Sequence, residues 1–408
     1  MKILWICPTL LHPTINGSQI RTLGILRHLS RKNEIHFVGT ARHGQTTDQK
    51  DEYCSVVHAF PHQPPVRRSL AFAVDAFLNL FSPVPLYVAR YASRPALECV
   101  KRLLGANTYD VVVVDFLLSV PNLPASHLAN AVLFQHNVEA RIMGRLAAET
   151  AAGPRRAYLS YMARRVEQYE KAACSQVRHV ITVSASDSAY ITEHYGVKHT
   201  TSIATGVNVQ HFERPAEASA VSPDAPHSDL VFIGSMDYLP NIQGVHWFVE
   251  RVLPLIHASR PATTVALVGK YPDSSIQALG VKDNRIRVTG TVPDVRPYLW
   301  NAEASIVPLL AGSGTRLKIY EAMAAGVPVI STALGAEGLA YTDGTDIVLA
   351  SEPESFAAAC LDLLEHRGRR DAIAQAGHVL VKSRFDWSAV AEEFQGILER
   401  AMASGPPG

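Results

Sequence analysis

Short apolar segments, spaced far enough apart to leave room for a helix between them, are the feature that most restricts how this chain can fold. Most of these segments are continuous apolar runs, which predict strands buried on both faces, with helices as crossover connections. They fall into two series: MKILWIC, EIHFVGT, DVVVVDFL, AVLFQHN and HVITVS, then LVFIGS, TTVALVG, IRVTG, ASIVPL, VPVIST and DIVLA. The chain is therefore predicted to be an α/β protein with two doubly wound domains. Their loop-bearing edges are expected to face each other across a cleft.

The segment between the two series, residues 213–229, is rich in Pro, Ala, Ser and Asp and is predicted to be a linker. A chain of 408 residues has room for two domains with substantial cores. The 38 basic residues nearly balance the 37 acidic ones, so charge gives no argument for a nucleic-acid partner. The five cysteines show no paired spacing, which makes a disulfide framework or a zinc site unlikely and fits a reducing cytosol.

The expected location is cytoplasmic, because the first predicted strand begins at Met1 with no signal-peptide pattern before it. No apolar run reaches the roughly 20 residues that span a bilayer. In residues 67–81, Leu70, Val74, Phe77 and Phe81 would share one helix face, behind two arginines. An interfacial helix and a buried core helix both fit this pattern, and the core helix is the favoured interpretation.

Two cations stand where a helix is expected to begin. In PLLAGSGTRLKIYEAMAAGVPVIST, Arg316 and Lys318 fall at the first turn of a predicted helix that Gly326 ends. A helix N-terminus already carries partial positive charge, so both residues cost stability there unless an anion lies among them. A phosphate is the most economical such anion, since backbone N–H groups at a helix N-terminus also bind it.

The residues around these cations extend the prediction to a nucleotide. Gly314 makes the preceding loop pliable, and Ser313 or Thr315 can cap the helix. Glu321 lies further along the helix, where its carboxylate could accept hydrogen bonds from ribose hydroxyls. A nucleoside diphosphate would satisfy all of these groups. The alternative is a solvated face on which Lys318 and Glu321 simply pair.

Further candidates follow other strands. Asn16 and Gly17 form the bend after the first strand, where Ser18 can cap the next helix, so this bend offers a second helix N-terminus that a phosphate could reach. An ordinary turn between a strand and a helix explains these residues equally well. His136 ends a strand at the predicted cleft edge, so a structural role and a catalytic one are both open.

In the second series, Gly234 and Ser235 form a turn between a strand and a helix. Thr291 and Val292 follow the strand IRVTG and expose backbone that could bind a nucleobase edge.

Taken together, these segments resemble the retaining glycosyltransferases of family 4, which have the B-type glycosyltransferase fold. The resemblance rests on the order and spacing of QHNVEA, VITVSASDSAYITEHYGV, FIGSMDYLPNIQG and VTGTVPDVRPYL, and above all on GSGTRLKIYEAMAAGVPVISTALGAEGL. It implies domains at residues 1–206, on the acceptor side, and 207–380, on the nucleotide-sugar side. Residues 381–408, which include FDWSAVAEEFQGILERA, resemble the family's terminal helix that crosses back to the first domain.

The resemblance implies transfer of a sugar, with retention of configuration, from a nucleoside-diphosphate sugar to a glycan, lipid-linked or small-molecule acceptor, as in polysaccharide biosynthesis. It assigns ribose binding to Glu321, contact with the diphosphate and sugar to the Gly17 loop, and contact with the sugar to His136. Arg316 and Lys318 would stabilise the charge that develops on the leaving diphosphate. No Asp-x-Asp motif is present, so neither a metal nor another cofactor is expected.

Two departures from the family pattern affect these assignments. Ser235 stands where many relatives have an arginine, and Pro240 or Asn241 stands where they have a lysine, so Arg316 and Lys318 are expected to replace both cations. Ser313 occupies the position of the first glutamate of the family's two-glutamate motif.

The alternatives to a glycosyltransferase are a nucleotide-sugar epimerase of the same fold and a catalytically silent binding protein.

Overall fold

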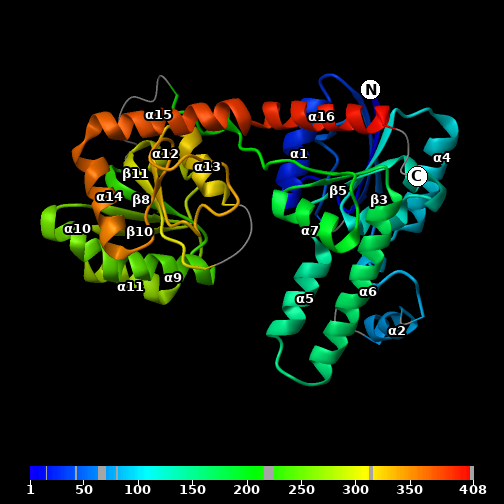
Figure 1. The fold of residues 1–408 in the computed structure, drawn as a ribbon, viewed down its shortest axis with the longest axis horizontal. Helices are drawn as coiled ribbons and strands as arrows, with labels where there is room; N and C mark the ends of the chain where they lie inside the picture. Colours follow the sequence, from blue (N-terminus) through cyan, green and yellow to red (C-terminus); the bar gives the residue numbers. More distant parts are fainter. Residues whose placement is uncertain are drawn as a thin grey trace. The chain divides into compact units, whose positions relative to one another are not determined.

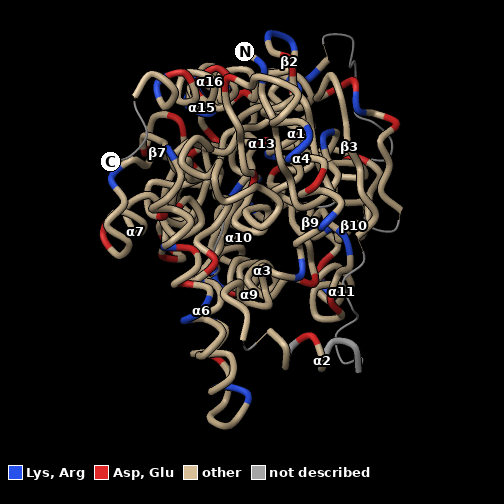
Figure 2. Tube along the Cα trace, turned by 90° about the vertical axis from the view of Figure 1, so that its right-hand side faces the viewer, with Lys and Arg blue, Asp and Glu red and all other residues tan. Residues whose placement is uncertain are grey.

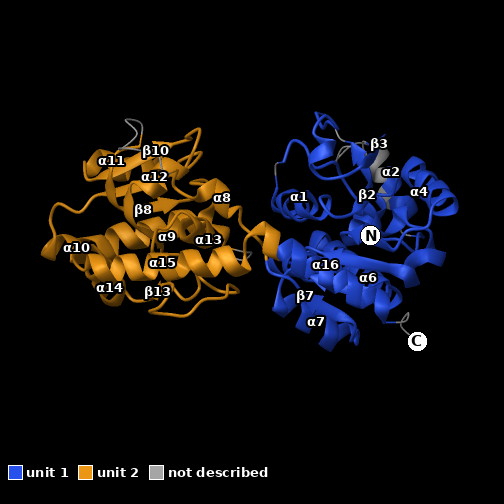
Figure 3. Cartoon of the chain, turned by 90° about the horizontal axis from the view of Figure 1, so that it is seen from above, with its two compact units in different colours: residues 1–204, 390–408 blue, residues 205–389 orange. Residues whose placement is uncertain are grey.

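The computed structural model of the chain describes residues 1–14, 16–41, 44–62, 70–79, 81–215, 225–311 and 316–404. The chain forms two compact units, coloured separately in Figure 3. Unit 1 comprises residues 1–204 and 390–408, and unit 2 comprises residues 205–389. The predicted linker is too long at its C-terminal end, because Ser228 and Asp229 already belong to a strand.

Unit 1 contains one parallel sheet with the strand order β3-β2-β1-β4-β5-β6-β7 (Figure 1). Its strands are β1 (Lys2–Cys7), β2 (Glu34–Ala41), β3 (Val56–Pro61), β4 (Val111–Asp115), β5 (Ala131–Gln135), β6 (His179–Thr182) and β7 (Thr200–Ser202). Its helices are α1 (Gly17–Leu29), α2 (Leu70–Asn79), α3 (Leu86–Ala89), α4 (Arg94–Ala106), α5 (Glu139–Glu149), α6 (Pro154–Gln176), α7 (Ala185–Tyr195) and most of α16 (Trp387–Ala403).

Unit 2 repeats this architecture with the strand order β10-β9-β8-β11-β12-β13, again with parallel pairing. Its strands are β8 (Ser228–Ile233), β9 (Val265–Val268), β10 (Ile286–Gly290), β11 (Ala302–Val307), β12 (Val329–Ser331) and β13 (Val348–Leu349). Its helices are α8 (Val209–Phe212), α9 (Leu239–Trp247), α10 (Leu253–Ser259), α11 (Ser274–Lys282), α12 (Arg296–Trp300), α13 (Leu317–Ala324), α14 (Pro353–Glu365) and α15 (Arg367–Arg384).

The predicted fold class is confirmed, since every apolar segment of the two series forms a strand of a parallel, doubly wound sheet. Two strands were missed. β3 and β7 form the outer edges of the unit 1 sheet, and their residues are partly exposed or polar. An edge strand is covered less than a central one and therefore needs no continuous apolar run.

The favoured prediction for residues 67–81, a buried core helix, is wrong for the part that the structure describes. In α2 and just after it, the side chains of Phe77, Leu78 and Phe81 are 62%, 61% and 80% exposed. Among the α2 side chains that the structure describes, it is the polar Asn79 that is buried. Arg165 of α6 donates a hydrogen bond to the side-chain oxygen of Asn79 at 3.1 Å. None of the described helices is both long and apolar enough to cross a bilayer.

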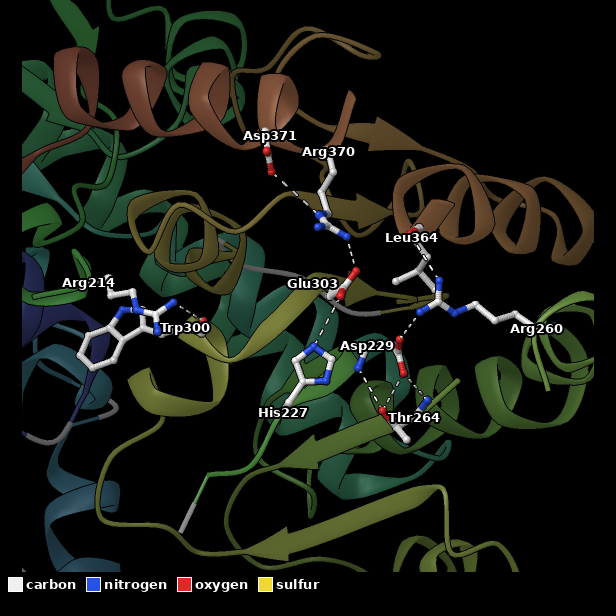
Figure 4. Close-up of polar contacts among 10 residues, drawn as sticks. All are labelled: Arg214, His227, Asp229, Arg260, Thr264, Trp300, Glu303, Leu364, Arg370 and Asp371. Atoms are coloured by element: carbon white, nitrogen blue, oxygen red, sulfur yellow. Dashed lines mark hydrogen bonds and ion pairs between the residues drawn. The ribbon is translucent and has the colours of Figure 1, made fainter. Parts of the chain in front are cut away.

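A polar network fastens the amino ends of the unit 2 strands (Figure 4). Asp229 of β8 accepts hydrogen bonds at 2.8 Å from the backbone and the hydroxyl of Thr264, and pairs with Arg260 at 2.9 Å. Glu303 of β11 pairs with Arg370 of α15. These contacts are structural and lie at the edge of the sheet opposite to the carboxyl ends of its strands.

Helix α16 packs on unit 1 from Val390 onward through an aromatic cluster. Phe394 is fully buried, with its ring centroid 5.6 Å from that of Trp5 in β1 and 5.1 Å from that of Phe134 in β5. The C-terminal helix therefore completes the core of the N-terminal sheet.

We predict that Phe394→Ala lowers the free energy of unfolding by about 3–5 kcal/mol, because it removes a fully buried ring and leaves a cavity. Glu393→Ala is the matched control, since Glu393 is the exposed neighbour on the same helix and should change stability by no more than about 0.5 kcal/mol. Denaturant unfolding monitored by tryptophan fluorescence measures both. Similar values for the two variants would contradict the packing role.

Candidate functional site

The candidate residues of each unit lie where parallel strands end. In both sheets the carboxyl ends of neighbouring strands meet at one edge, the usual place for ligand binding in doubly wound folds.

Two glycines bring the backbones after β8 and β9 into contact. The Gly234 N–H donates to the Val268 carbonyl at 3.0 Å. A Cβ atom at Gly269 would lie 1.7 Å from the Gly234 carbonyl oxygen, so no side chain fits there. A Cβ atom at Gly234 would lie 2.8 Å from Asn241 Nδ2 and 2.9 Å from Lys318 Nζ. The predicted Gly234 turn therefore lies directly against the polar side chains of Asn241 and Lys318.

Lys318 reaches this turn from α13. Its ammonium donates a hydrogen bond to Asn241 Oδ1 at 3.1 Å and lies 4.3 Å from the centroid of the Phe232 ring. The other atom of the amide, Asn241 Nδ2, donates to the Ser235 carbonyl at 2.8 Å, which fixes the orientation of the amide. A cation from the predicted phosphate motif thus lies against the Gly234 turn, although the two are far apart in sequence.

The surroundings of Lys318 disfavour its charged form. Burial lowers the pKa of Lys318 to about 7, with Arg316 lowering it further and Glu321 opposing the shift. Burial raises the pKa of Glu321, and Lys318 opposes that change. Both side chains remain partly exposed. An anionic ligand that reached Lys318 would restore its charged form, because an opposite charge favours the ammonium.

The two cations of the predicted phosphate motif lie at the start of α13. Arg316 is buried at the N-cap position of this helix, and Lys318 is its second residue. Ser313, Gly314 and Thr315 lie outside the described residues.

Elsewhere in unit 2, the Ser235 hydroxyl donates to Asp237 Oδ1 at 2.5 Å. Thr291 and Val292 follow β10, which is separated from β8 by β9. Their proposed contact with a nucleobase stays a prediction.

In unit 1, the turn after β1 begins helix α1. Asn16 caps this helix by accepting a hydrogen bond from the Gln19 N–H at 3.0 Å, so the expectation that Ser18 is the cap is wrong. The Ser18 hydroxyl donates to Asn16 Oδ1 instead. Gly17 is exposed, and a Cβ atom there would meet nothing within 4 Å. Packing within unit 1 therefore does not require glycine at this position.

His136 follows β5 and is buried in a charged network. Its Nδ1 lies 3.0 Å from Arg21 Nη1 and its Nε2 lies 2.6 Å from Asp115 Oδ1. Because arginine only donates, Nδ1 must accept and Nε2 must carry the proton that is donated to Asp115. Burial lowers the pKa of His136, and Asp115 opposes the shift. The imidazole is therefore neutral with both nitrogens engaged, and it can contact a substrate through a nitrogen only if one of these partners moves.

Asp115 is the centre of this network. Its Oδ2 also accepts hydrogen bonds from the Thr22 hydroxyl at 2.7 Å and from Trp5 Nε1 at 3.0 Å. Sequence analysis missed Asp115 and Arg21, and it named Asn241 only as one of two residues at the position where many relatives have a lysine. Asp115 carried a usable signal, since it is a carboxylate at the end of a continuous apolar strand, whereas nothing in the sequence distinguished Arg21.

Glu170 of α6 holds the segment that carries His136. Its carboxylate accepts hydrogen bonds from Gln135 Nε2 at 3.0 Å and from the backbone N–H groups of Glu139 and Ala140 at 2.9 and 3.1 Å. It also accepts one from the Tyr195 hydroxyl at 2.9 Å, while burial raises the pKa of Glu170 to about 7. The start of α5 is therefore fixed directly behind His136.

No group of three or more His, Cys, Asp or Glu side chains in the described ranges is placed to hold a metal ion. At the edge of the unit 2 sheet, the described polar groups include the Lys318 ammonium, the Asn241 amide and the backbone of the Gly234 turn. Such groups suit an anionic ligand.

Comparison with known proteins connects these features to a family. The family described as "Glycosyltransferase Family 4" matches residues 15–211, and the one described as "Glycosyl transferases group 1" matches residues 227–366. A phosphatidyl-myo-inositol mannosyltransferase of Mycobacterium leprae is 30% identical over 145 residues, which are 34% of this chain and 38% of the relative. The chain spans between 38% and 54% of the length of the curated relatives it matches.

Solved structures share the fold along almost the whole chain. The sucrose-phosphate synthase of Thermosynechococcus elongatus superposes with a TM-score of 0.63 at 18% identity, covering 98% of this chain and 99% of that one. Anabaena Alr3699/HepE in complex with UDP and glucose gives 0.59 at 16% identity, covering 98% and 100%. With both units matched by glycosyltransferase families and with this two-sheet fold, the chain belongs to the family 4 glycosyltransferases of the B-type fold.

Proposed function

We propose that the protein transfers a sugar, with retention of configuration, from a nucleoside-diphosphate sugar to a glycan, lipid-linked or small-molecule acceptor. The observation that carries the proposal is the Lys318 ammonium held by Asn241 against the Gly234 turn. A cation, a close-lying backbone turn and a helix N-terminus together provide what a diphosphate requires. Glu321, one helical turn beyond Lys318, is proposed to bind the ribose.

In the proposed mechanism, departure of the nucleoside diphosphate builds negative charge on a phosphate oxygen. Lys318 and Arg316 stabilise this charge, together with N–H groups of the loop that contains Ser313, Gly314 and Thr315. Because protein cations supply the charge, the reaction is proposed to need no metal. The Gly17 turn and His136 of unit 1 are proposed to face the transferred sugar, with residues 1–206 forming the acceptor side.

The proposed setting is the cytoplasm, with a peripheral contact at the inner face of the membrane. The exposed apolar residues of α2 and the position after it support this contact, since Val74, Phe77 and Phe81 are 49%, 62% and 80% exposed. Such a surface is typical of a helix that lies in a membrane interface.

The test is to incubate the protein with a panel of nucleotide sugars, with and without candidate acceptors, in excess chelator. Acceptor-dependent release of nucleoside diphosphate is expected. Sugar isomerisation without an acceptor would identify an epimerase instead. Loss of activity that added metal restores would contradict the metal-independent mechanism.

We predict that Lys318→Ala lowers the affinity for a nucleoside diphosphate, probed with UDP, at least about tenfold, because a charge-assisted contact is lost. In the wild type, affinity should fall as pH rises above about 7, by up to about tenfold per pH unit, because Lys318 must then take up a proton to bind. Calorimetric titrations between pH 6 and 8.5 measure both effects.

Lys318→Arg is the matched variant, since arginine keeps its charge throughout this range and should flatten the pH dependence. Any slope that remains reports Glu321 and the phosphate itself. An unchanged slope would show that Lys318 does not carry the pH effect.

We predict that Gly17→Ala leaves stability unchanged or raises it by up to about 1 kcal/mol, because the added methyl group meets open space. Turnover should fall, and Gly17→Val should lower it further, because bulk on the turn keeps the donor away. Gly105→Ala is the control, as a helical glycine with similar open space. Wild-type kcat/KM in Gly17→Val would exclude close approach of a substrate.

We predict that His136→Ala lowers kcat at least about tenfold while the affinity for UDP stays within about twofold, because His136 belongs to unit 1 and the nucleotide to unit 2. The variant should also lose stability, since buried Asp115 loses a hydrogen-bond donor. Assays well below the melting temperature of the variant separate the two effects. A kcat near the wild-type value would leave His136 with a structural role only.

A further inference from the structure

A second basic site lies in unit 1, away from the phosphate motif of α13. Residues of helices α5, α6 and α7 line an open pocket of about 390 Å³, a size typical of ligand sites. Its lining residues are Ala140, Arg141, Gly144, Arg145, Ala163, Arg164, Glu167 and Tyr190. Helices α5 and α6 form a hairpin that extends beyond the strands of unit 1 (Figure 1), and basic positions recur along it (Figure 2).

The three arginines of the pocket are compensated very differently. Arg141 pairs with Asp187 Oδ1 at 3.0 Å, and its guanidinium lies 5.3 Å from the centroid of the Tyr190 ring. Arg145 and Arg164 are exposed, and in the part of the chain that the structure describes neither has a hydrogen-bond or ion-pair partner, so both guanidinium groups are open to a ligand. Arg141 and Arg145 are also four residues apart on one helix, a spacing at which like charges repel. Glu167 is the single carboxylate of the lining, so positive charge is in excess.

Small residues leave space beside the arginines, since Ala140, Gly144 and Ala163 belong to the lining of the pocket. A Cβ atom at Gly144 would meet nothing within 4 Å, so packing does not demand glycine there. Glycine inside a helix costs roughly 1 kcal/mol relative to alanine. An anionic group in the pocket would pair with Arg145 and Arg164 and would fit the space beside Gly144.

We propose that this pocket binds a phosphate group of the acceptor substrate. The proposal deepens and rests on the proposed glycosyltransferase function. The pocket lies on the same edge of the unit 1 sheet as His136, because α5, whose Ala140 lines the pocket, begins three residues after His136. Glu170 fixes the backbone N–H groups of Glu139 and Ala140 at the start of this helix. The phosphate can belong to a soluble acceptor or to a lipid headgroup. The exposed apolar residues of α2, which Arg165 ties to α6, favour the lipid source.

The first experiment measures binding of inorganic pyrophosphate to the full chain with a saturating nucleoside diphosphate present to occupy the donor site. Arg145→Ala with Arg164→Ala should weaken binding at least about tenfold. The matched control replaces Arg155 and Arg156, which lie on the same hairpin but not in the pocket, and should leave binding within about twofold. Equal affinity in the wild type and the pocket variant, or an equal loss in the control, overturns the proposal.

Gly144→Leu tests the same site without changing charge, because it fills the pocket, and it should weaken pyrophosphate binding to a similar extent. Gly144→Ala should keep most of the binding and raise stability. If Gly144→Leu binds as the wild type does, the pocket is not where the anion lies.

A second arm distinguishes the two sources of phosphate. If the phosphate is lipid-borne, the wild type should co-sediment with vesicles of phosphatidylglycerol and phosphatidylcholine. The fraction of the pocket variant that sediments with the vesicles should then be at most half of the wild-type fraction. If only soluble pyrophosphate depends on Arg145 and Arg164, the acceptor is soluble.

Binding of a panel of nucleoside diphosphates (UDP, GDP and ADP) is measured throughout. Wild-type protein that binds none of them contradicts the proposed function, whereas pocket variants that bind the nucleoside diphosphate and anions as the wild type does contradict only this inference.

Discussion

Parallel strand pairing is the constraint on which both candidate sites depend. It brings the carboxyl ends of β1, β4 and β5 together in unit 1, and those of β8, β9 and β11 together in unit 2. Asp115 and His136 meet for this reason, and so do Gly234 and Gly269. The chemistry of the chain is therefore concentrated where the sheet order places neighbouring strand ends.

Clustered positive charge is the second feature that the two units share. In unit 2, Arg316 and Lys318 lie at the start of α13, where the helix itself adds partial positive charge. In unit 1 the charge of the buried Arg21 is offset by Asp115, while Arg145 and Arg164 are exposed and have no such partner among the described residues. Elsewhere, pairs such as Arg260 with Asp229 and Arg285 with Asp283 are complete. Grouped cations thus mark both the proposed donor site and the proposed acceptor pocket.

The sequence predicted the fold well because continuous apolar runs are a strong signal for buried parallel strands. It failed at β3 and β7, where exposure at the sheet edge removes that signal, and at α2, where an apolar face is exposed rather than buried. It also chose the wrong cap for α1, because Asn16 and Ser18 are both good capping residues and only backbone geometry separates them. Site prediction had most to work with at α13, where several unusual residues are close together in the chain, and the roles assigned to them stay predictions.

By itself the sequence determined the two doubly wound domains and the family resemblance and supplied the candidate phosphate motif, since periodicity and local motifs are properties of neighbouring residues. Tertiary structure alone decided which distant groups meet. The contact of Lys318 with Asn241 and the Gly234 turn, the position of Arg21 against His136, and the grouping of arginines from α5 and α6 each join residues from different helices or strands. Such contacts depend on how helices pack on the sheet, and spacing along one chain does not encode that packing in a form that can be read locally.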